Sequence, residues 1–457
     1  MKLSFHGGVR GVTGSCFLLE FKESKILVDC GMFQGQRMVS NKNLIDVGFN
    51  AKDIDAGIIT HAHYDHIGRY PLIVKQGFRG TIYTTPPTKA LASIVLEDAQ
   101  HVMSENARRN GDIILFSPDD VKRTESQMKG IGYHTQFEIV PGVNVMFHDA
   151  GHILGSAYVT IDVPGSETED GKPKRLLFSG DIGNEEVPIL PDTEPILKAD
   201  IVVCETTYGN RDHEPVPQRN KELVKMVSSI INRGGTLLIP AFSIERTQEL
   251  LYELDLLADE GVLPKVPVYL DSPLAIKATE IYRHFKHYLR FDRPIHSSSD
   301  HDFFTFPRLV ETLRMDASKK INSDRGPKII IAGSGMMTGG RILHHLIRYL
   351  SDKKSGVLII GYQAEGTLGR QIKDGAKKVK IHQKDIDVNA TIKAIGSFSA
   401  HGDRNKLRSW LKPKEGKIDQ VFLVHGDEKV KPEFKEFIEK EIDSEVIIPM
   451  FSQEFVF

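Results

Sequence analysis

The sequence contains little of what stabilises small secreted proteins or anchors proteins in membranes. Only three of its 457 residues are cysteines, and Cys16, Cys30 and Cys204 form no Cys-X-X-Cys pair, which excludes a disulfide framework and a zinc knuckle. No apolar run approaches the roughly 20 residues of a membrane span. The N-terminus also lacks the hydrophobic segment of a secretion signal. We therefore expect a reduced, cytoplasmic protein with no membrane partner.

The chain also has no large excess of charge of one sign. Its 59 Lys and Arg residues are balanced by 61 Asp and Glu residues, so the net charge of −2 does not predict a polyanionic partner for the whole chain. Residues 370–417 are an exception, with 13 Lys and Arg against 5 Asp and Glu, an excess of eight positive charges. Such a segment predicts local attraction for phosphates, although a solvated face of strands and helices has the same composition.

The length of the chain exceeds that of one ordinary domain. Alternating residues at 15–21 and 25–31 predict antiparallel strands. From about residue 215, apolar strands, small-residue turns and helices follow one another repeatedly, which is typical of parallel βαβ units. The pattern then returns to short strands, among them VFLVHG (421–426). We predict three segments, 1–208, 209–368 and 369–457, of which the second is a separate domain.

The densest group of chemically active residues is the sequence HAHYDH, which directly follows a predicted strand at 56–60. It places His61, His63, Asp65 and His66 within six residues, and these side chains can converge only from a turn. Such a turn suits a two-metal site, whereas a polar turn without a metal rarely has this density. Imidazole and carboxylate ligands favour Zn²⁺, with Mn²⁺ or Fe²⁺ next.

Three further motifs extend this pattern along the chain. His152 lies in AGHILGSA, Asp181 lies in FSGDIG, and Asp29 lies in VDCG near the N-terminus. With HAHYDH, these residues make the chain resemble the metallo-β-lactamase superfamily from residue 1 to about 205. The resemblance implies an α/β fold with an αββα sandwich. It also implies that Asp29 orients ligating histidines from outside the metal coordination sphere.

Later residues resemble one branch of that superfamily. Glu205 in VCETTYGNR, His401 in SFSAHGD and His425 in VFLVHGDE resemble motifs A, B and C of the β-CASP proteins, which cut nucleic acids. The middle of the chain then resembles the β-CASP domain, a parallel sheet flanked by helices that is inserted into the lactamase fold. RNA-processing members such as ribonuclease J have His at motif C, whereas DNA-repair relatives typically have an apolar residue. His425 therefore favours RNA.

The resemblance also implies roles for these residues around two zinc ions, with Mn²⁺ as an alternative. The first ion is expected to bind His61, His63, His152 and Asp181, and the second to bind Asp65, His66, His425 and the bridging Asp181. A hydroxide between the metals would attack phosphorus, because Zn²⁺ lowers the pKa of bound water to about 7. His401, oriented by Glu205, would act as general acid. The products would carry 5′-phosphate and 3′-hydroxyl ends.

Turns between strands and helices in the middle segment suggest contacts to the RNA backbone. GSGMMTGGR (333–341) offers glycine-rich backbone at a helix N-terminus. Similar turns between a strand and a helix lie earlier in the chain, at 241–243 and 271–273. The residues expected to contact phosphate are Ser334, Gly335, Arg341, Arg246 and Ser272. Any of these turns is also compatible with ordinary strand-to-helix connections. The glycine-rich turn lacks the Lys-Ser/Thr of a P-loop, which argues against nucleotide hydrolysis.

The sequence thus predicts a zinc-dependent ribonuclease that acts on single-stranded RNA. A DNA nuclease of the same family, a small-molecule hydrolase of thioester or lactam type and an inactive RNA-binding scaffold are the alternatives. The sequence does not distinguish an endonuclease from a 5′-exonuclease, and it is compatible with a homodimer. Other histidines, among them His101, His134 and His148, have no ligand context and are predicted to be structural.

Overall fold

The structure is a computed structural model that describes residues 1–35, 41–44, 47–185, 187–213, 216–290, 302–396 and 399–457. The chain divides into two compact units, residues 1–212 with 401–457 and residues 213–400. The first unit therefore contains both ends of the chain. No helix within the described ranges has the length and apolar character needed to cross a membrane.

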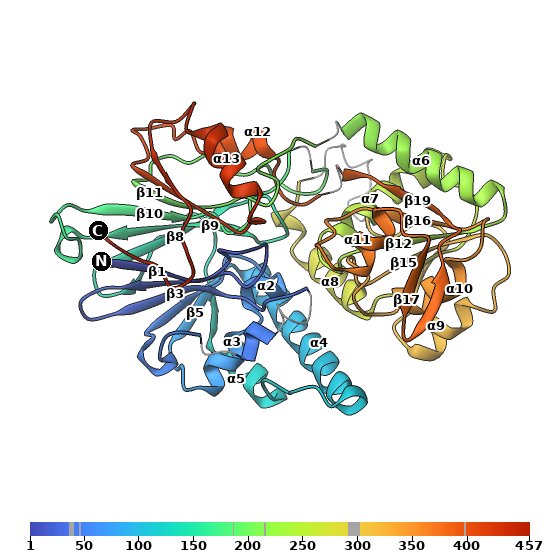
Figure 1. Ribbon diagram of the computed structural model, residues 1–457, viewed down its shortest axis with the longest axis horizontal. Helices are drawn as coiled ribbons and strands as arrows, with labels where there is room; N and C mark the ends of the chain where they lie inside the picture. The colour runs from blue at the N-terminus through green and yellow to red at the C-terminus, as the bar shows by residue number, and fades with distance from the viewer. Residues whose placement is uncertain (36–40, 45–46, 186, 214–215, 291–301, 397–398) are drawn as a thin grey trace. The chain divides into compact units, whose positions relative to one another are not determined.

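Two seven-stranded sheets form the centre of the first unit (Figure 1). One sheet has the order β22 (Glu454–Val456), β1 (Lys2–Gly7), β2 (Cys16–Glu20), β3 (Lys25–Cys30), β4 (Ala56–Ile58), β5 (Thr81–Thr84) and β6 (Met128–Gly130). The other has the order β21 (Glu445–Ile447), β20 (Gln420–Val424), β11 (Ile201–Glu205), β10 (Lys174–Phe178), β9 (Ala157–Val163), β8 (Val143–Asp149) and β7 (Phe137–Val140). Each sheet has antiparallel strands on one side and parallel strands on the other.

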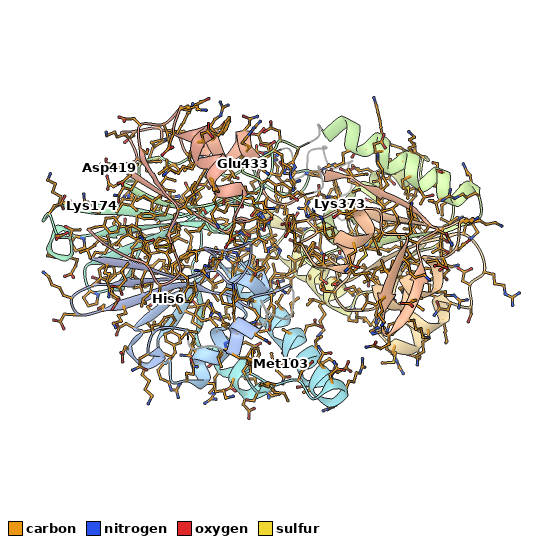
Figure 2. All side chains as sticks on the ribbon, viewed as in Figure 1. His6, Met103, Lys174, Lys373, Asp419 and Glu433 are labelled. Atoms are coloured by element: carbon orange, nitrogen blue, oxygen red, sulfur yellow. The ribbon has the colours of Figure 1, made fainter. Side chains whose placement is uncertain are left out.

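The two sheets pack face to face through apolar side chains. Phe5 of β1 contacts Phe422 of β20, and Phe17 of β2 contacts Phe178 of β10, with ring centroids 5.3 and 5.8 Å apart. Figure 2 shows side chains throughout this unit, with His6 inside it and Asp419 at its surface. Burial of this apolar layer is the main force that holds the sheets together.

Helices cover the outer faces of both sheets, which confirms the predicted αββα sandwich. On the side of the first sheet lie α2 (Tyr64–Ile67), α3 (Tyr70–Lys75), α4 (Pro86–Asn110) and α5 (Pro118–Gln127) (Figure 1). On the side of the second lie α12 (Arg404–Trp410) and α13 (Val430–Ile438). Helix α4 begins as the sequence predicts, with two prolines in its first turn and the Thr85 hydroxyl accepting a hydrogen bond from the amide of Thr88.

The second unit contains a six-stranded parallel sheet, as the strand–turn–helix pattern predicted. Its order is β14 (Leu309–Glu311), β13 (Val268–Leu270), β15 (Lys328–Ala332), β12 (Thr236–Pro240), β16 (Gly356–Ile359) and β19 (Thr391–Ala394). Its helices are α6 (Val216–Asn232), α7 (Arg246–Asp259), α8 (Pro273–His284), α9 (Met315–Ile321), α10 (Ile342–Tyr349) and α11 (Leu368–Lys373). The second unit also contains a hairpin of β17 (Lys378–Ile381) and β18 (Lys384–Asp387).

Candidate metal centre

The polar residues singled out in the first unit lie at the carboxyl ends of its strands. They follow or end β3 (Asp29), β4 (His61, His63), β10 (Asp181), β11 (Glu205) and β20 (His425), with Asp65 and His66 in α2 and His152 between β8 and β9. Residues 401–403 dock onto the turn after β10, because Gly402 donates its amide hydrogen to the carbonyl of Ile182 over 2.7 Å. Parallel strands bring their carboxyl ends to one edge, and this edge is where such sheets bind ligands.

Four of these side chains form a first group of potential metal ligands. One ligand atom from each of His61, His63, His152 and Asp181 lies within 4.8 Å of the others. His63 Nδ1 lies 3.0 Å from His61 Nε2 and 3.2 Å from His152 Nε2. Asp181 Oδ2 lies 3.4 Å from His61 Nε2. All four side chains are buried or nearly so.

A second group lies beside the first and shares Asp181 with it. Asp65, His66 and His425 place their ligand atoms within the same 4.8 Å limit. His425 Nε2 lies 3.3 Å from Asp65 Oδ2 and 3.3 Å from His66 Nε2. The second carboxylate oxygen of Asp181, Oδ1, lies 3.3 Å from His66 Nε2. Asp181 therefore directs one oxygen toward each group.

The protonation of the first group fits a bound cation, whereas the carboxylates of Asp181 and Asp29 outweigh burial and raise the pKa of His66 in the second group well above 6.5. Burial, together with neighbouring imidazoles, lowers the pKa of His61, lowers that of His63 to about 3 and lowers that of His152 well below 6.5. The three rings are thus neutral and present lone pairs to one another. Asp181 Oδ1 is buried and makes no hydrogen bond within the described part of the chain. Neutral imidazoles beside a carboxylate are the donor set of a zinc site.

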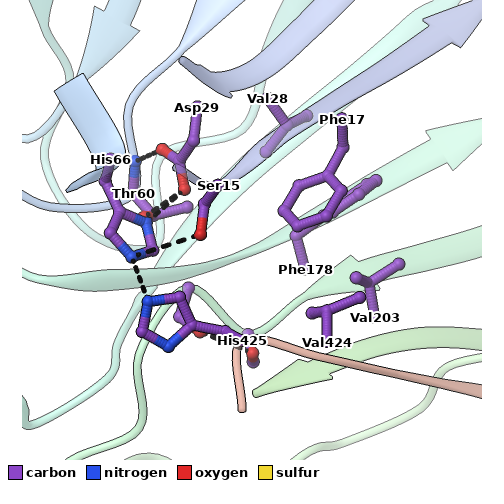
Figure 3. A pocket seen from close by; sticks show the side chains of 12 residues that line it. Ser15, Phe17, Val28, Asp29, Thr60, His66, Phe178, Val203, Val424 and His425 are labelled. Carbon is purple, nitrogen blue, oxygen red and sulfur yellow. Dashed lines mark hydrogen bonds and ion pairs between the residues drawn. The ribbon is translucent and has the colours of Figure 1, made fainter. Parts of the chain in front are cut away.

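Asp29 holds His66 in a fixed orientation behind the second group (Figure 3). Asp29 Oδ2 accepts a hydrogen bond from His66 Nδ1 over 2.7 Å, so His66 Nε2 faces His425. Thr60 fixes the carboxylate in turn, since its amide and hydroxyl donate to the two oxygens of Asp29 over 2.9 Å each. Figure 3 shows Phe17, Phe178 and other apolar side chains on the far side of a small cavity that His66 and His425 also line. This arrangement orients His66 as carboxylates orient metal-binding histidines.

His401 and Glu205 form a separate pair next to Asp181. His401 Nδ1 lies 3.0 Å from Glu205 Oε1 and 3.8 Å from Asp181 Oδ2. Glu205 is fully buried and accepts hydrogen bonds from the amides of Ile182 and Thr207. Burial opposes the charged form of His401, but Glu205 and Asp181 outweigh it and raise the pKa of His401 to about 9. His401 thus carries two ring protons at neutral pH and can give one to a substrate atom.

Two threonines that the sequence analysis missed support the site. Thr60 immediately precedes His61 and holds Asp29 as described above. The Thr207 hydroxyl lies 3.2 Å from His425 Nδ1 and donates to the His425 carbonyl over 3.1 Å. Both threonines adjoin residues of the recognised motifs, and a systematic search for hydroxyl residues beside ligand candidates would have found them.

The residues predicted to contact phosphate all lie in the second unit. The turns after β12, β13 and β15 meet, because Ser272 Oγ lies 3.3 Å from Ser243 Oγ and a Cβ on Gly333 would contact both serines. Ser334 Oγ accepts hydrogen bonds from the amides of Thr338 and Gly339, and Gly335 packs on the Phe242 ring. The turns therefore lie together at one edge of the parallel sheet.

The two arginines of that set make internal contacts. Arg341 donates to Asp271 Oδ1 over 2.7 Å and to the carbonyls of Thr312 and Leu313. Arg246 is buried and forms an ion pair with Glu249. Their guanidinium groups thus have structural partners inside the unit, and a role of either arginine at RNA phosphate stays a prediction.

The basic segment 370–417 is shared between the two units, which divide at residue 400. Among the described residues, at least eight of its 13 cationic side chains form ion pairs with carboxylates: Arg370, Lys378, Lys393, Arg404, Lys406, Arg408, Lys412 and Lys417. The positive charge available to a polyanion is correspondingly smaller than the composition predicts.

Comparison with known proteins places the chain among related enzymes. Three domain-family profiles match it: a metallo-beta-lactamase superfamily domain over residues 18–168, a Beta-Casp domain over 247–372 and a Zn-dependent metallo-hydrolase RNA specificity domain over 385–449. Ribonuclease TTHA0252 of Thermus thermophilus is 36% identical over 428 residues, which cover 94% of each chain. The chain belongs to the β-CASP family of the metallo-β-lactamase superfamily. This confirms the resemblance read from the motifs, and family membership implies binding of divalent metal.

Other relatives of this β-CASP protein have varied names. An RNase J-like protein of Methanocaldococcus jannaschii is 31% identical over 98% of both chains. Cleavage and polyadenylation specificity factor subunit 3 of Dictyostelium discoideum is 32% identical, and the match covers 90% of this chain and 51% of that protein. Among solved structures, a protein of unknown function from Enterococcus faecalis aligns over the whole chain with a TM-score of 0.55 and 14% identity, which supports the fold alone.

Gly31 offers a test of how closely the second group depends on local packing. A Cβ at Gly31 would overlap the backbone carbonyl of Asp65 and approach the amide of His66. Gly31→Ala is therefore expected to displace Asp65 and His66 and to lower the divalent metal bound per chain. The measurement is metal analysis of the purified variant, with circular dichroism to establish folding.

Gly11→Ala is the matched control for this substitution, because a Cβ there has no neighbour within 4 Å. It is expected to leave metal content unchanged. A folded Gly31→Ala protein with full metal content would show that the close approach of residues 31 and 65 does not position the ligands.

Proposed function

We propose that the chain is a metal-dependent ribonuclease that hydrolyses RNA phosphodiester bonds with two zinc ions. The observation that carries the proposal is the pair of ligand groups joined by Asp181, with the protonated His401 beside them. Support for RNA comes from the RNA specificity domain that matches residues 385–449 and from relatives named as ribonucleases. His425 lies within the second group, in keeping with the RNA-processing pattern of motif C.

Each residue has a defined part in the proposed reaction. His61, His63, His152 and Asp181 would hold one Zn²⁺, and Asp65, His66, His425 and Asp181 the other. When bound, the ions supply a water that ionises near neutral pH and positive charge for the phosphoryl oxygens. His401 donates a proton to the departing 3′ oxygen. Before that step, the negative charge of Glu205 raises the pKa of His401 and so keeps the imidazole protonated. The cleaved RNA then carries 5′-phosphate and 3′-hydroxyl ends.

Residues that metal binding alone does not require favour a nuclease over a small-molecule hydrolase. Glu205 is fully buried and makes three hydrogen bonds, to two backbone amides and to His401. These bonds hold its carboxylate in a fixed position beside His401. A lactam or thioester hydrolase would share the zinc ligands without needing the His401–Glu205 pair or the second unit. We further propose that the backbone at Ser334 and Gly335, with Ser272, contacts RNA phosphates.

The experiment that tests this function is cleavage of a single-stranded RNA labelled at either end, beside a DNA of the same sequence. We expect about two zinc ions at the candidate metal centre, cleavage of RNA and little cleavage of DNA. Treatment with a chelator should reduce cleavage to background, and added Zn²⁺ should restore it. The fragment pattern separates internal cuts from stepwise removal of 5′ nucleotides.

Three results would contradict the proposal in different ways. Cleavage of DNA at a rate equal to that of RNA would favour the DNA nuclease. Bound zinc with neither polymer cut would favour a small-molecule hydrolase. Cleavage that persists after the metal has been removed and shown to be absent would exclude metal-ion catalysis altogether.

A further inference from the structure

A second cluster of potential ligands lies outside the candidate metal centre, on the same unit. His134, His148 and Glu194 each place a ligand atom within 4.8 Å of the other two. His134 Nε2 lies 2.9 Å from both carboxylate oxygens of Glu194, and His148 Nδ1 lies 3.6 Å from Glu194 Oε2. The sequence analysis predicted these histidines to be structural, because 60 residues separate His134 from Glu194 and no motif relates them.

The backbone that carries the three side chains is fixed by hydrogen bonds. His134 donates its amide hydrogen to the carbonyl of Phe147 on β8 over 3.0 Å, and His148 lies on that strand. Glu194 donates its amide to Asp149 and accepts a hydrogen bond at its carbonyl from Trp410 Nε1, over 3.0 Å each. The three donors are therefore preorganised, and a ligand would find them already in place.

The orientation of the His148 ring directs Nδ1 toward Glu194. The ring stacks on Tyr158, with centroids 4.6 Å apart and planes 6° apart. His148 Nε2 lies 3.1 Å from Thr160 Oγ1, and the Thr160 hydroxyl donates to the carbonyl of Met146 over 3.5 Å. Thr160 therefore accepts a hydrogen bond from Nε2, which leaves Nδ1 as the ring nitrogen that faces the carboxylate. His148 Nδ1 and Glu194 Oε2, 3.6 Å apart, are thus placed to share one metal ion.

From this geometry we propose that His134, His148 and Glu194 bind a third divalent metal ion, of the zinc class. Two imidazoles and one carboxylate are a donor set that Zn²⁺ takes up in proteins, with water in the fourth position. A tetrahedral ion with bonds of about 2.0 Å separates its ligand atoms by about 3.3 Å. The distance from His134 Nε2 to Glu194 Oε1, 2.9 Å, is somewhat shorter than this value, and that from His148 Nδ1 to Glu194 Oε2, 3.6 Å, is somewhat longer. His148 is 18% exposed and Glu194 31%, so water reaches the fourth position.

The third site has a structural consequence for the candidate metal centre. Thr193, next to Glu194, donates its hydroxyl to the carbonyl of Ala150 over 2.8 Å, and Glu194 itself donates to Asp149. Residues 149 and 150 lead directly to His152 of the first ligand group. An ion at Glu194 would add to the hydrogen bonds that already hold the segment before His152, while none of its three ligands belongs to the centre itself. It stabilises the loop and takes no part in the cleavage reaction.

The test is a zinc titration of the whole chain, with bound metal measured by mass spectrometry after equilibration at defined free Zn²⁺. The wild type is expected to bind one ion more per chain than His134→Ala and Glu194→Gln. The quantity compared is the difference in bound zinc per chain between the wild type and each variant. It therefore does not depend on how many ions the candidate metal centre holds. RNA cleavage by His134→Ala should equal that of the wild type, so failure of the ribonuclease proposal and failure of this one are distinguishable.

His101→Ala is the matched control. His101 is exposed and lies 3.6 Å from Glu105 one helical turn away, which gives a histidine–carboxylate pair without a third donor. It is expected to bind as much zinc as the wild type. Equal zinc in wild type, His134→Ala and Glu194→Gln would overturn the third site and leave a plain ion pair. A loss of zinc in His101→Ala as large as that in His134→Ala would also overturn it, as nonspecific surface binding.

Discussion

Asp181→Asn is expected to release metal from both ligand groups and to abolish RNA cleavage. Asp181 is buried and directs one oxygen to each group, at 3.4 Å from His61 Nε2 and 3.3 Å from His66 Nε2. Asparagine keeps the shape but removes the negative charge that both cations need. Since metal ions supply several kcal/mol of transition-state stabilisation, the loss in kcat/KM should be about 1,000-fold or more. Metal analysis and RNA cleavage on the same protein sample measure both effects.

Asp29→Asn is the control for this substitution, because it also removes a buried carboxylate beside a histidine. Asp29 contacts His66 from behind and lies in neither ligand group. Loss of such an outer partner typically costs about 10- to 100-fold in metal affinity or activity. We therefore expect weaker zinc binding that excess Zn²⁺ restores in Asp29→Asn but not in Asp181→Asn. Full zinc content in Asp181→Asn would refute its bridging position.

The metal-ligand candidates could be predicted from the sequence partly by local pattern and partly by resemblance to known motifs. HAHYDH follows a buried strand directly, so chain geometry alone brings His61 and His66 to the strand end. Asp181 and His425 also follow predicted strands, and parallel strands share their carboxyl edge. Strand direction is compatible with this edge, but it was the resemblance to the metallo-β-lactamase and β-CASP motifs that brought together residues more than 300 positions apart.

Contacts that depend on tertiary packing could not be predicted in this way. Arg341 follows a glycine-rich turn, and the sequence suggested phosphate as its partner, but the structure gives it Asp271 from the neighbouring strand end. His134 lies in a turn and Glu194 in an irregular segment, and no periodicity relates such positions. Their meeting depends on how β8 and the segment after β10 pack, which composition and spacing do not determine.

His401→Ala is expected to abolish most RNA cleavage while leaving both zinc ions bound. His401 belongs to neither ligand group, and its Nδ1 faces Glu205 rather than the histidine ligands. General acid catalysis contributes typically about 100- to 10,000-fold, and the loss should appear in kcat with little change in KM. A leaving group that needs no proton tests the role directly: an RNA with sulfur in place of the bridging 3′ oxygen should be cut by His401→Ala at close to the wild-type rate.

Glu205→Gln tests whether Glu205 keeps His401 protonated at the pH of the reaction. Burial alone would lower the pKa of His401, and the negative charges of Glu205 and Asp181 raise it to about 9 instead. Glutamine removes one of these charges, so the pKa of His401 should fall. The acid form exists only below that pKa, and the alkaline limb of the pH–rate profile should therefore move to lower pH in Glu205→Gln. A profile whose alkaline limb coincides with that of the wild type would remove Glu205 from this role.

For His401→Ala, the contradicting outcome is an equal loss of cleavage rate with the oxygen and the sulfur leaving group. That result would mean that His401 positions the substrate rather than donating the proton.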